Sequence, residues 1–232
     1  MQHVKTSYCP DVARTCLRPE YDPSNRITIC HAFREAPPQC RAPRVELDYC
    51  IDEYEFPNRR GEKPPVMVSF FDAEQSCAQQ GKRLCLESEW IAACEGPEET
   101  PFPHGYQRSA EKCNIDNKWI GPSLSRVYSV DPEVQRAELA RLDQSEPSGS
   151  RPECRSGFGV FDLTGNVDEW VRADVPRGRS RFAALKGGAW GHVRNACRPV
   201  TTSHTPDFKY YFIGFRCCAD AHAPTSAASV EK

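Results

Sequence analysis

A histidine and a cysteine, His192 and Cys197, lie five residues apart in the segment 185–200, which reads LKGGAWGHVRNACRPV. An imidazole and a thiolate can together bind copper or zinc. A Gly-Gly pair and an aromatic residue precede them, as in the floor of a pocket. The segment therefore predicts either a metal-dependent active site or a well-packed strand and turn without a metal.

A second candidate metal site is the turn 162–169, which reads DLTGNVDE. Its two ends carry the carboxylates of Asp162 and Glu169, and the glycine between them lets the backbone aim carbonyl groups inward. Hard oxygen ligands at such spacing suit Ca²⁺. The alternative is an Asx-type turn in which Glu169 forms a salt bridge.

Thirteen cysteines are the most informative feature of the composition. They are scattered among 20 prolines and 14 glycines, rather than grouped in the CxxC pairs typical of zinc sites. This pattern predicts disulfide bonds and an oxidising compartment, with at least one cysteine unpaired because 13 is odd. We interpret Met1 as an artificial start and expect that a leader peptide has been removed. The alternative is a reduced cytosolic protein with buried thiols.

Charge and hydropathy argue against two classes of protein. The chain has 232 residues, a formal net charge of −2 and no cluster of Lys and Arg, so we expect no nucleic-acid partner. No apolar run approaches the roughly 18 residues that span a bilayer, and residues 1–30 lack the apolar core of a signal peptide. We expect no transmembrane segment, and a lipid anchor upstream of this sequence stays open.

Local patterns predict the elements that position these residues. Alternating apolar and charged residues from Val45 are typical of a strand that ends near Pro57. Ser69 and Asp72 fit a capping box for a helix that Gly81 ends. The helix places Phe70, Ala73 and Cys77 on one face.

Two further helices are expected. The segment 86–96 places Trp90 and Cys94 on one helical face. The segment 131–144 begins with Asp131 as N-cap before a proline, and its polar composition indicates a surface excursion.

The domain organisation follows from these patterns. One irregular, loop-rich α+β domain is predicted over 45–222, with little regular secondary structure. Residues 1–44 form a Cys- and Pro-rich extension of loops and short strands packed on it, and 223–232 a disordered tail.

Four segments occur in an order found in the formylglycine-generating enzyme family, and the chain from about 45 to 220 resembles a divergent member of it. They are GKRLCLESEWIAAC (81–94), FDLTGNVDEWV (161–171), LKGGAWGHVRNACR (185–198) and TPDFKYYFIGFRCCAD (205–220). The resemblance implies a disulfide-stapled fold distantly related to C-type lectins, with bound calcium. It also implies a cystine between Cys77 and Cys217, whereas the family partner of Cys94 has no equivalent cysteine here.

The family pattern also assigns calcium ligands. The first site would take carboxylates from Asp162 and Glu169 and backbone oxygens from Gly165 and Val167. A second site would begin at Asn114 and Ile115, but the carboxylate expected about a dozen residues later has no clear equivalent.

Members of the family that oxidise a substrate cysteine to formylglycine hold Cu(I) with two cysteines five residues apart. On that motif the second cysteine is Cys197, and His192 replaces the first. Exchanging a thiolate for an imidazole removes a charge and weakens electron donation to the copper.

Two more pocket positions depart from the family pattern. Ala189 replaces the serine of the oxygen pocket, and Asp168 replaces a tryptophan, which we expect to place fixed negative charge against an apolar wall. Trp190 and Arg194 complete the predicted pocket.

These departures predict an exported protein without the oxidase activity, which acts as a calcium-stabilised, monomeric binding module for a protein or peptide partner. The expected location is secreted, periplasmic or in the cell envelope. Two alternatives stay open: a copper- or non-heme-iron-dependent oxidase that acts on a thiol through His192 and Cys197, and a purely structural domain of the envelope.

Overall fold

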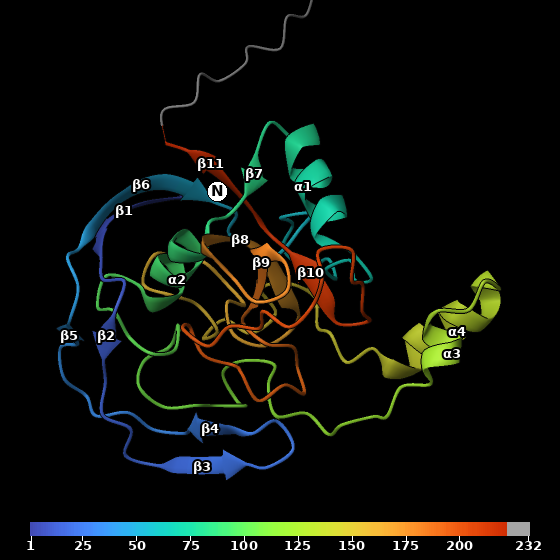
Figure 1. Ribbon diagram of the computed structural model, residues 1–232, viewed down its shortest axis with the longest axis horizontal. Helices are drawn as coiled ribbons and strands as arrows, with labels where there is room; N and C mark the ends of the chain where they lie inside the picture. The colour runs from blue at the N-terminus through green and yellow to red at the C-terminus, as the bar shows by residue number, and fades with distance from the viewer. Residues whose placement is uncertain (222–232) are drawn as a thin grey trace, which may run out of the picture.

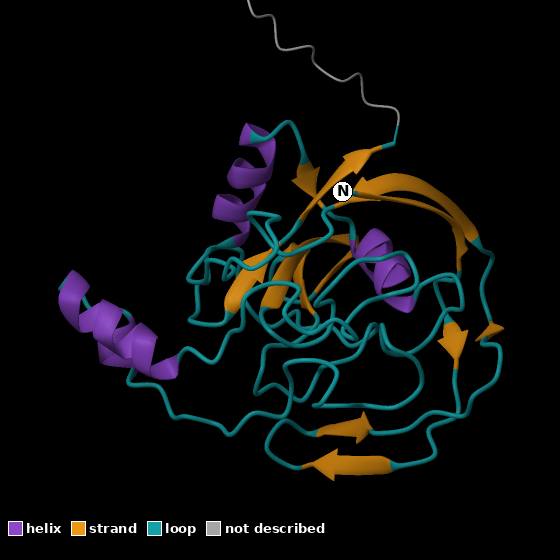
Figure 2. Cartoon of the chain, turned by 180° about the vertical axis from the view of Figure 1, so that it is seen from behind, coloured by secondary structure: helices purple, strands orange, loops and turns teal. Residues whose placement is uncertain are grey.

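The computed structural model of the protein describes residues 1–221, so the tail predicted over 223–232 lies outside the described part. Loops make up most of the interior, and short strands and helices surround them (Figures 1 and 2). Within residues 1–221, no helix has the length and apolar character that a bilayer crossing requires. The predicted α+β class with little regular structure is confirmed.

A four-stranded sheet joins the two ends of the described chain. Its strands, in spatial order, are β1 (Gln2–Tyr8), β6 (Val45–Ile51), β11 (Cys217–Asp220) and β7 (Arg83–Leu84). Strands β1 and β6 pair antiparallel along their whole length. The strand predicted from Val45 ends earlier than expected, because Asp52 and Phe56 turn to bond the carbonyls of Cys217 and Phe215.

The extension wraps around the left and lower edges of the molecule in Figure 1. After β1 it forms two small antiparallel pairs, which are β2 (Val12–Ala13) with β5 (Gln39–Cys40) and β3 (Pro19–Asp22) with β4 (Ile27–Cys30). Short strands tied by cystines were predicted here. The boundary at residue 44 is nevertheless imperfect, because β1 belongs to the four-stranded sheet of the main domain.

Helix α1 (Phe70–Gln79) begins as its sequence predicts. The Ser69 hydroxyl accepts the amide of Asp72, and the Asp72 carboxylate accepts the amide of Ser69, which closes the capping box. The expected apolar face is buried, and Cys77 on that face bonds to Cys217.

The other helices differ in burial. Helix α2 (Glu87–Glu95) lies inside the molecule, with Trp90 and Cys94 fully buried. Helices α3 (Leu124–Val127) and α4 (Pro132–Leu142) project from one side in both views, as the polar sequence predicts. The side chain of Asp131 caps α4 by accepting the amide of Glu133.

A three-stranded sheet carries the candidate site. Its order is β10 (Ile213–Phe215), β8 (Asp168–Arg177) and β9 (Arg181–Lys186). Strand β10 runs parallel to β8, whereas β9 is antiparallel to it. The turn 162–169 leads into β8 and the Gly-Gly segment leaves the antiparallel β9, so both candidate sites lie at the same end of these two strands.

Twelve of the thirteen cysteines form six disulfide bonds, and Cys50 is the unpaired one. The pairs are Cys9–Cys40, Cys16–Cys30, Cys77–Cys217, Cys85–Cys218, Cys94–Cys197 and Cys113–Cys154. The pairing that the family resemblance implies for Cys77 is therefore present.

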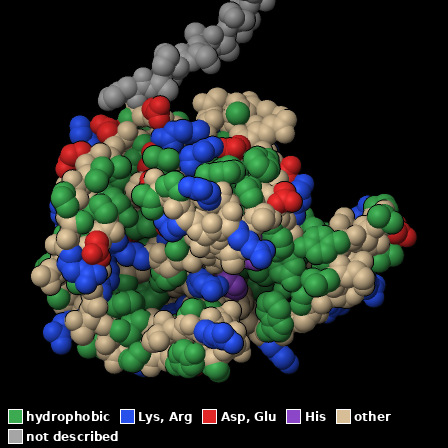
Figure 3. Space-filling model, viewed as in Figure 1, with side chains coloured by type: hydrophobic (Ala, Val, Ile, Leu, Met, Phe, Trp, Pro, Cys, Tyr) green, Lys and Arg blue, Asp and Glu red, His purple; other side chains and the backbone are tan. Residues whose placement is uncertain are grey.

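One face of the molecule is hollowed near its middle (Figure 3). Lys and Arg side chains, drawn in blue, and a purple histidine lie at the hollow, with apolar side chains beside them. The extension and the segment that follows β9 both border a cavity lined mainly by arginine and apolar side chains.

Candidate functional site

The segment 187–198 leaves β9 through two glycines with positive φ, +89° at Gly187 and +67° at Gly188. A side chain at Gly188 would bring its Cβ 2.9 Å from Nδ2 of Asn195. The buried Asn195 amide donates to the carbonyls of Gly187, at 3.2 Å, and Ala189, at 2.9 Å. One side chain therefore fixes both ends of this tight loop.

Arg108, which lies outside the segment 187–198 in the sequence, also forms hydrogen bonds with this loop. Its guanidinium pairs with Asp116 at 2.6 Å and donates to Oδ1 of Asn195 at 2.8 Å and to the His192 carbonyl at 3.2 Å. Sequence reasoning missed both Asn195 and Arg108. Asn195 stood within the quoted motif, but Arg108 lies in a loop without any recognisable pattern.

His192 lies largely buried against an aromatic ring. Its ring centroid is 5.6 Å from that of Phe212, and its Nδ1 atom is buried without a hydrogen-bond partner. Burial, with a contribution from the nearby positive charge of Arg194, lowers the pKa of His192 from 6.5 to about 4. The imidazole is therefore neutral at physiological pH.

Cys197 is bonded to Cys94 of α2, and both residues are fully buried. The sequence left a free thiol and a cystine as alternatives for Cys197, and the structure has the cystine. This corrects the prediction of a metal site at His192 and Cys197, because a sulfur bonded to another sulfur offers no thiolate to Cu(I). The residues present do not fit the copper of the oxidase family.

The other predicted pocket residues are packed rather than open. Ala189 and Trp190 are buried, and the Trp190 ring packs against Tyr211, with 6.2 Å between centroids. Asp168, the first residue of β8, is buried and accepts the amide of Gly188 at 3.2 Å. Arg194 is half-buried at the cavity described above.

The charge expected at Asp168 needs a correction. Burial raises the pKa of this carboxyl from 3.8 to about 7, although the Gly188 amide and the charge of Arg194 oppose the shift. The fixed negative charge expected from the sequence is therefore wrong, because the Asp168 carboxyl group is partly protonated near neutral pH.

In the turn 162–169, Glu169 forms a buried salt bridge with Arg216, which lies between β10 and β11. Both carboxylate oxygens contact the guanidinium at 2.7 Å, and Trp90 donates its Nε1 hydrogen at 2.9 Å. The salt bridge of the alternative interpretation is therefore present. Carboxylate oxygens have further lone pairs, so this contact does not by itself exclude a cation.

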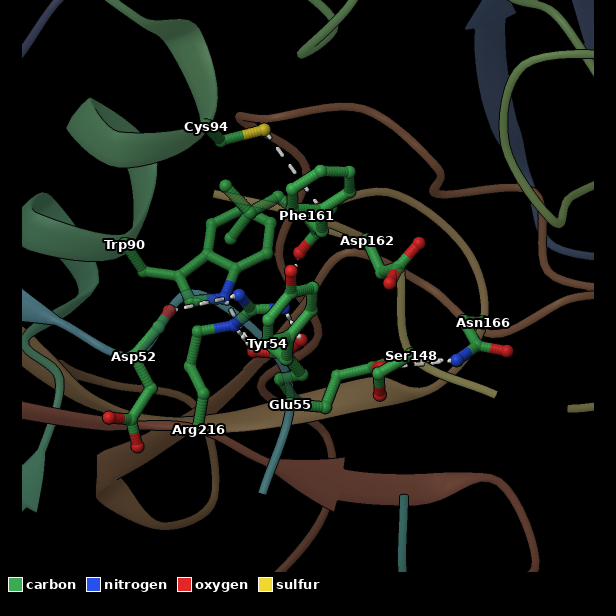
Figure 4. Close-up of polar contacts among 12 residues, drawn as sticks. Asp52, Tyr54, Glu55, Trp90, Cys94, Ser148, Phe161, Asp162, Asn166 and Arg216 are labelled. Carbon is green, nitrogen blue, oxygen red and sulfur yellow. Dashed lines mark hydrogen bonds and ion pairs between the residues drawn. The ribbon is translucent and has the colours of Figure 1, made fainter. Parts of the chain in front are cut away.

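Two more carboxyl groups, those of Asp162 and Glu55, are buried near Arg216 (Figure 4). Asp162 accepts the Gly149 amide at 2.7 Å, and Glu55 accepts from Asn166 at 2.9 Å. Burial raises the pKa of Asp162 from 3.8 to about 6, and burial with the charge of Asp162 raises that of Glu55. Three buried carboxyl groups thus lie near one guanidinium, and among them only Glu169 forms an ion pair with it. A cation bound beside them would favour their ionised forms.

A calcium ion in the turn 162–169 would need backbone carbonyl oxygens as ligands in addition to carboxylates. Within residues 1–221, no three side chains of His, Cys, Asp or Glu converge as metal ligands. Gly165, with φ +87°, lies so close to Asn114 that a Cβ there would approach its carbonyl oxygen to 2.3 Å. Together with Val167, which is buried, it would supply the carbonyls.

Asn114, from the second predicted calcium site, forms hydrogen bonds with the turn 162–169. The Asn114 amide donates to the Asn166 side chain at 3.0 Å and accepts from Asn117 at 2.9 Å. Its carbonyl accepts the amide of Asn166. Ile115 packs beside the Cys113–Cys154 disulfide bond. The side-chain amide and the carbonyl of Asn114 thus both form hydrogen bonds, and the second calcium site stays a prediction.

The fold and the altered pocket define a formylglycine-generating-type domain, and the comparisons with known proteins agree. Residues 48–221 match the sulfatase-modifying factor enzyme 1-like domain family. The chain belongs to this family, as a divergent member.

Curated relatives include both inactive and active enzymes. The chain is 31% identical over 170 residues to the inactive C-alpha-formylglycine-generating enzyme 2 of Bos taurus, covering 70% of this chain and 52% of that one. It is 29% identical over 185 residues to the formylglycine-generating enzyme of Mus musculus, covering 72% and 46%. The chain thus spans about half the length of these curated relatives.

Solved structures support the fold alone. CarF superposes with a TM-score of 0.55 at 15% identity, covering 94% of this chain and 97% of that one. PvdO from Pseudomonas aeruginosa gives 0.55 at 17% identity, covering 95% and 99%. Identities this low carry no information about activity.

Proposed function

We propose that this chain is a binding domain of the formylglycine-generating enzyme family that does not oxidise cysteine. The observation that carries the proposal is the Cys94–Cys197 disulfide bond. It occupies the sulfur that a copper site needs, while His192 replaces the other thiolate. A relative whose name states that it is inactive is consistent with this proposal.

The way the loop is held supports a role in recognition. Asn195 and Arg108 fix the main chain of 187–198 through buried hydrogen bonds, and the disulfide bond anchors it to α2. A surface that is rigid before its partner arrives loses little conformational entropy on binding. We propose a protein or peptide as the partner.

Calcium has a structural role in this proposal. Asp162 and Glu169 would supply carboxylate oxygens and Gly165 and Val167 carbonyl oxygens, in the hard-ligand set that Ca²⁺ prefers. The ion would favour the ionised forms of the buried carboxyl groups near Arg216. The carbonyls lie in a turn that positive φ angles at Asp162 and Gly165 shape.

The six disulfide bonds favour an oxidising location, and we propose export to the periplasm, the cell envelope or the medium. Reducing cytosol does not maintain structural disulfides of this kind in most organisms.

The test of the proposal is incubation of copper-loaded protein and O₂ with a sulfatase-type cysteine peptide, followed by mass spectrometry. We expect no mass loss of the kind that conversion of the thiol to an aldehyde produces. A Cys94→Ala variant, which frees the Cys197 thiol, should also be inactive, because Ala189, Asp168 and His192 stay unchanged. Turnover by the unmodified protein that disappears in Cys197→Ala would contradict the proposal.

A further inference from the structure

We propose that the cavity between the extension and the segment 193–200 binds the carboxylate group of an apolar ligand. The inference rests on the proposed binding function and names the chemistry of what is bound. The cavity has a volume of about 450 Å³, within the range of small-ligand sites.

The two walls come from distant parts of the chain. One wall is built by the extension, with Val12, Arg14 and β4, and the other by the loop that follows β9. None of the residues that line the cavity is acidic. The cationic ones are Arg14, Arg108, Arg194 and Arg198.

Carboxylates pair with three of the four guanidinium groups around the cavity. Arg14 and Arg198 share one buried carboxylate, that of Glu95, at 2.8 Å and 2.7 Å. Arg108 is neutralised by Asp116. Two carboxylates therefore pair directly with three of the four guanidinium groups, whereas Asp22 and Asp168 interact with the fourth, Arg194, only at longer range.

Arg194 supplies the free guanidinium. In the described part of the chain, no side chain or carbonyl forms a hydrogen bond or ion pair with it, although it lines the cavity. A guanidinium offers two parallel N–H groups that match the two oxygens of a carboxylate. Arg194 is therefore the expected anchor of the ligand.

Arg14 gives a second, independent indication of a missing acceptor. Its side chain is 10% exposed, and its Nε atom is buried without a hydrogen-bond partner. A buried donor without an acceptor costs free energy in the empty site. A carboxylate in the cavity would bring an acceptor and negative charge to this wall.

The remaining lining is apolar and defines the body of the ligand. Ile27 and Ile29 of β4, Phe33 and Phe102 surround the cavity, and Val193 closes it from the loop. Phe33 and Phe102 meet edge to face, with 5.9 Å between centroids. A carboxylate joined to an aromatic or branched aliphatic group would pair with the arginines and pack against the apolar side chains of the cavity. The ligand is either a free acid or the C-terminus of a peptide.

The extension wall of the cavity lies outside the residues 48–221 that match the family. Changes in the extension should therefore alter the binding of the ligand without any change in the matched domain.

The test uses calorimetry with two matched pairs of probes. The first pair is 3-phenylpropionate and 3-phenylpropanamide, and the second is N-acetyl-Ala-Ala-Phe with a free or an amidated C-terminus. We expect the acid of at least one pair to bind and its amide to bind at least about tenfold more weakly. The pair that binds distinguishes a free acid from a peptide C-terminus.

Two variants and one control separate the site from general charge. Arg194→Gln should weaken binding of the acid at least about tenfold, and Thr28→Glu, at an exposed position of the β4 wall, should also weaken it. Arg60→Gln, an exposed arginine elsewhere that changes the net charge equally, should leave the affinity unchanged.

Three results would overturn the inference: no binding of either acid, equal binding of the acids and their amides, or wild-type affinity in Arg194→Gln. None of these results affects the outcome of the cysteine-peptide assay. Failure here thus leaves the proposal of a non-oxidising domain standing, whereas turnover in that assay would remove it separately.

Discussion

Replacing His192 with glutamine should make the protein less sensitive to acid. The pKa of this histidine falls from 6.5 to about 4 on folding because the ring is largely buried. A histidine with a lowered folded-state pKa contributes stability that is present above its unfolded pKa and is lost as the pH falls towards the folded value. The relevant window is therefore pH 6.5 to 4.

The size of the effect follows from the two pKa values. The full difference of about 2.5 units corresponds to about 3.4 kcal/mol, and about 1.8 kcal/mol of it develops between pH 7 and pH 5. Glutamine is neutral throughout, so the variant should not lose this stability. Asp168 and Asp162, whose pKa values are raised, act in the opposite direction but are common to both proteins.

The measurement is urea denaturation of both proteins at pH 7 and pH 5, with free energies from linear extrapolation. The loss between the two pH values should be larger in wild type than in His192→Gln by about 1.8 kcal/mol. His3→Gln, which removes an exposed histidine, is the matched control. Equal losses in wild type and His192→Gln would refute the reasoning that burial keeps this ring neutral.

Three further outcomes are expected. Peptide mapping without reduction should recover Cys77 linked to Cys217, and removal of this disulfide bond, which closes a loop of 140 residues, should cost up to about 5 kcal/mol of unfolding free energy; an alkylated Cys77 in the unreduced protein would contradict this. A calcium chelator should lower the melting temperature of a calcium-saturated sample, and Asp162→Ala should abolish that difference; an unchanged melting curve in wild type would mean a plain turn. Arg216→Met should destabilise the protein by about 3–5 kcal/mol, because Glu169 is left buried without its partner; a loss below 1 kcal/mol in urea denaturation would show that water reaches the carboxylate.

Local signals determined which parts of the fold could be predicted. The starts of α1 and α4 depend on capping side chains within a few residues of each other, so Ser69 and Asp131 marked them correctly. The extension was also correctly predicted as short strands tied by cystines. Strand β1 was missed as part of the main sheet, since its partner β6 lies about 40 residues away and pairing over that distance leaves no local pattern.

The candidate site was less predictable for the same reason. The state of Cys197 depends on Cys94, which is 103 residues distant in sequence. Glu55 and Arg108 reach their sites from loops and carry no motif. The family resemblance indicated which positions matter, but only the packing around Asp168 and His192 determines how they titrate.

The pattern of disulfide bonds divides the chain into two covalent units. Cys9–Cys40 and Cys16–Cys30 close within the extension, and the other four close within the main domain. Cleavage between the units after Arg44 would thus leave two separately cross-linked fragments that only non-covalent contacts hold together. The extension is attached to the main domain by the pairing of β1 with β6 and by the Arg14–Glu95 ion pair, with no disulfide bond between the two units. A lineage could replace one wall of the cavity, and with it the ligand, while the main domain stays unchanged.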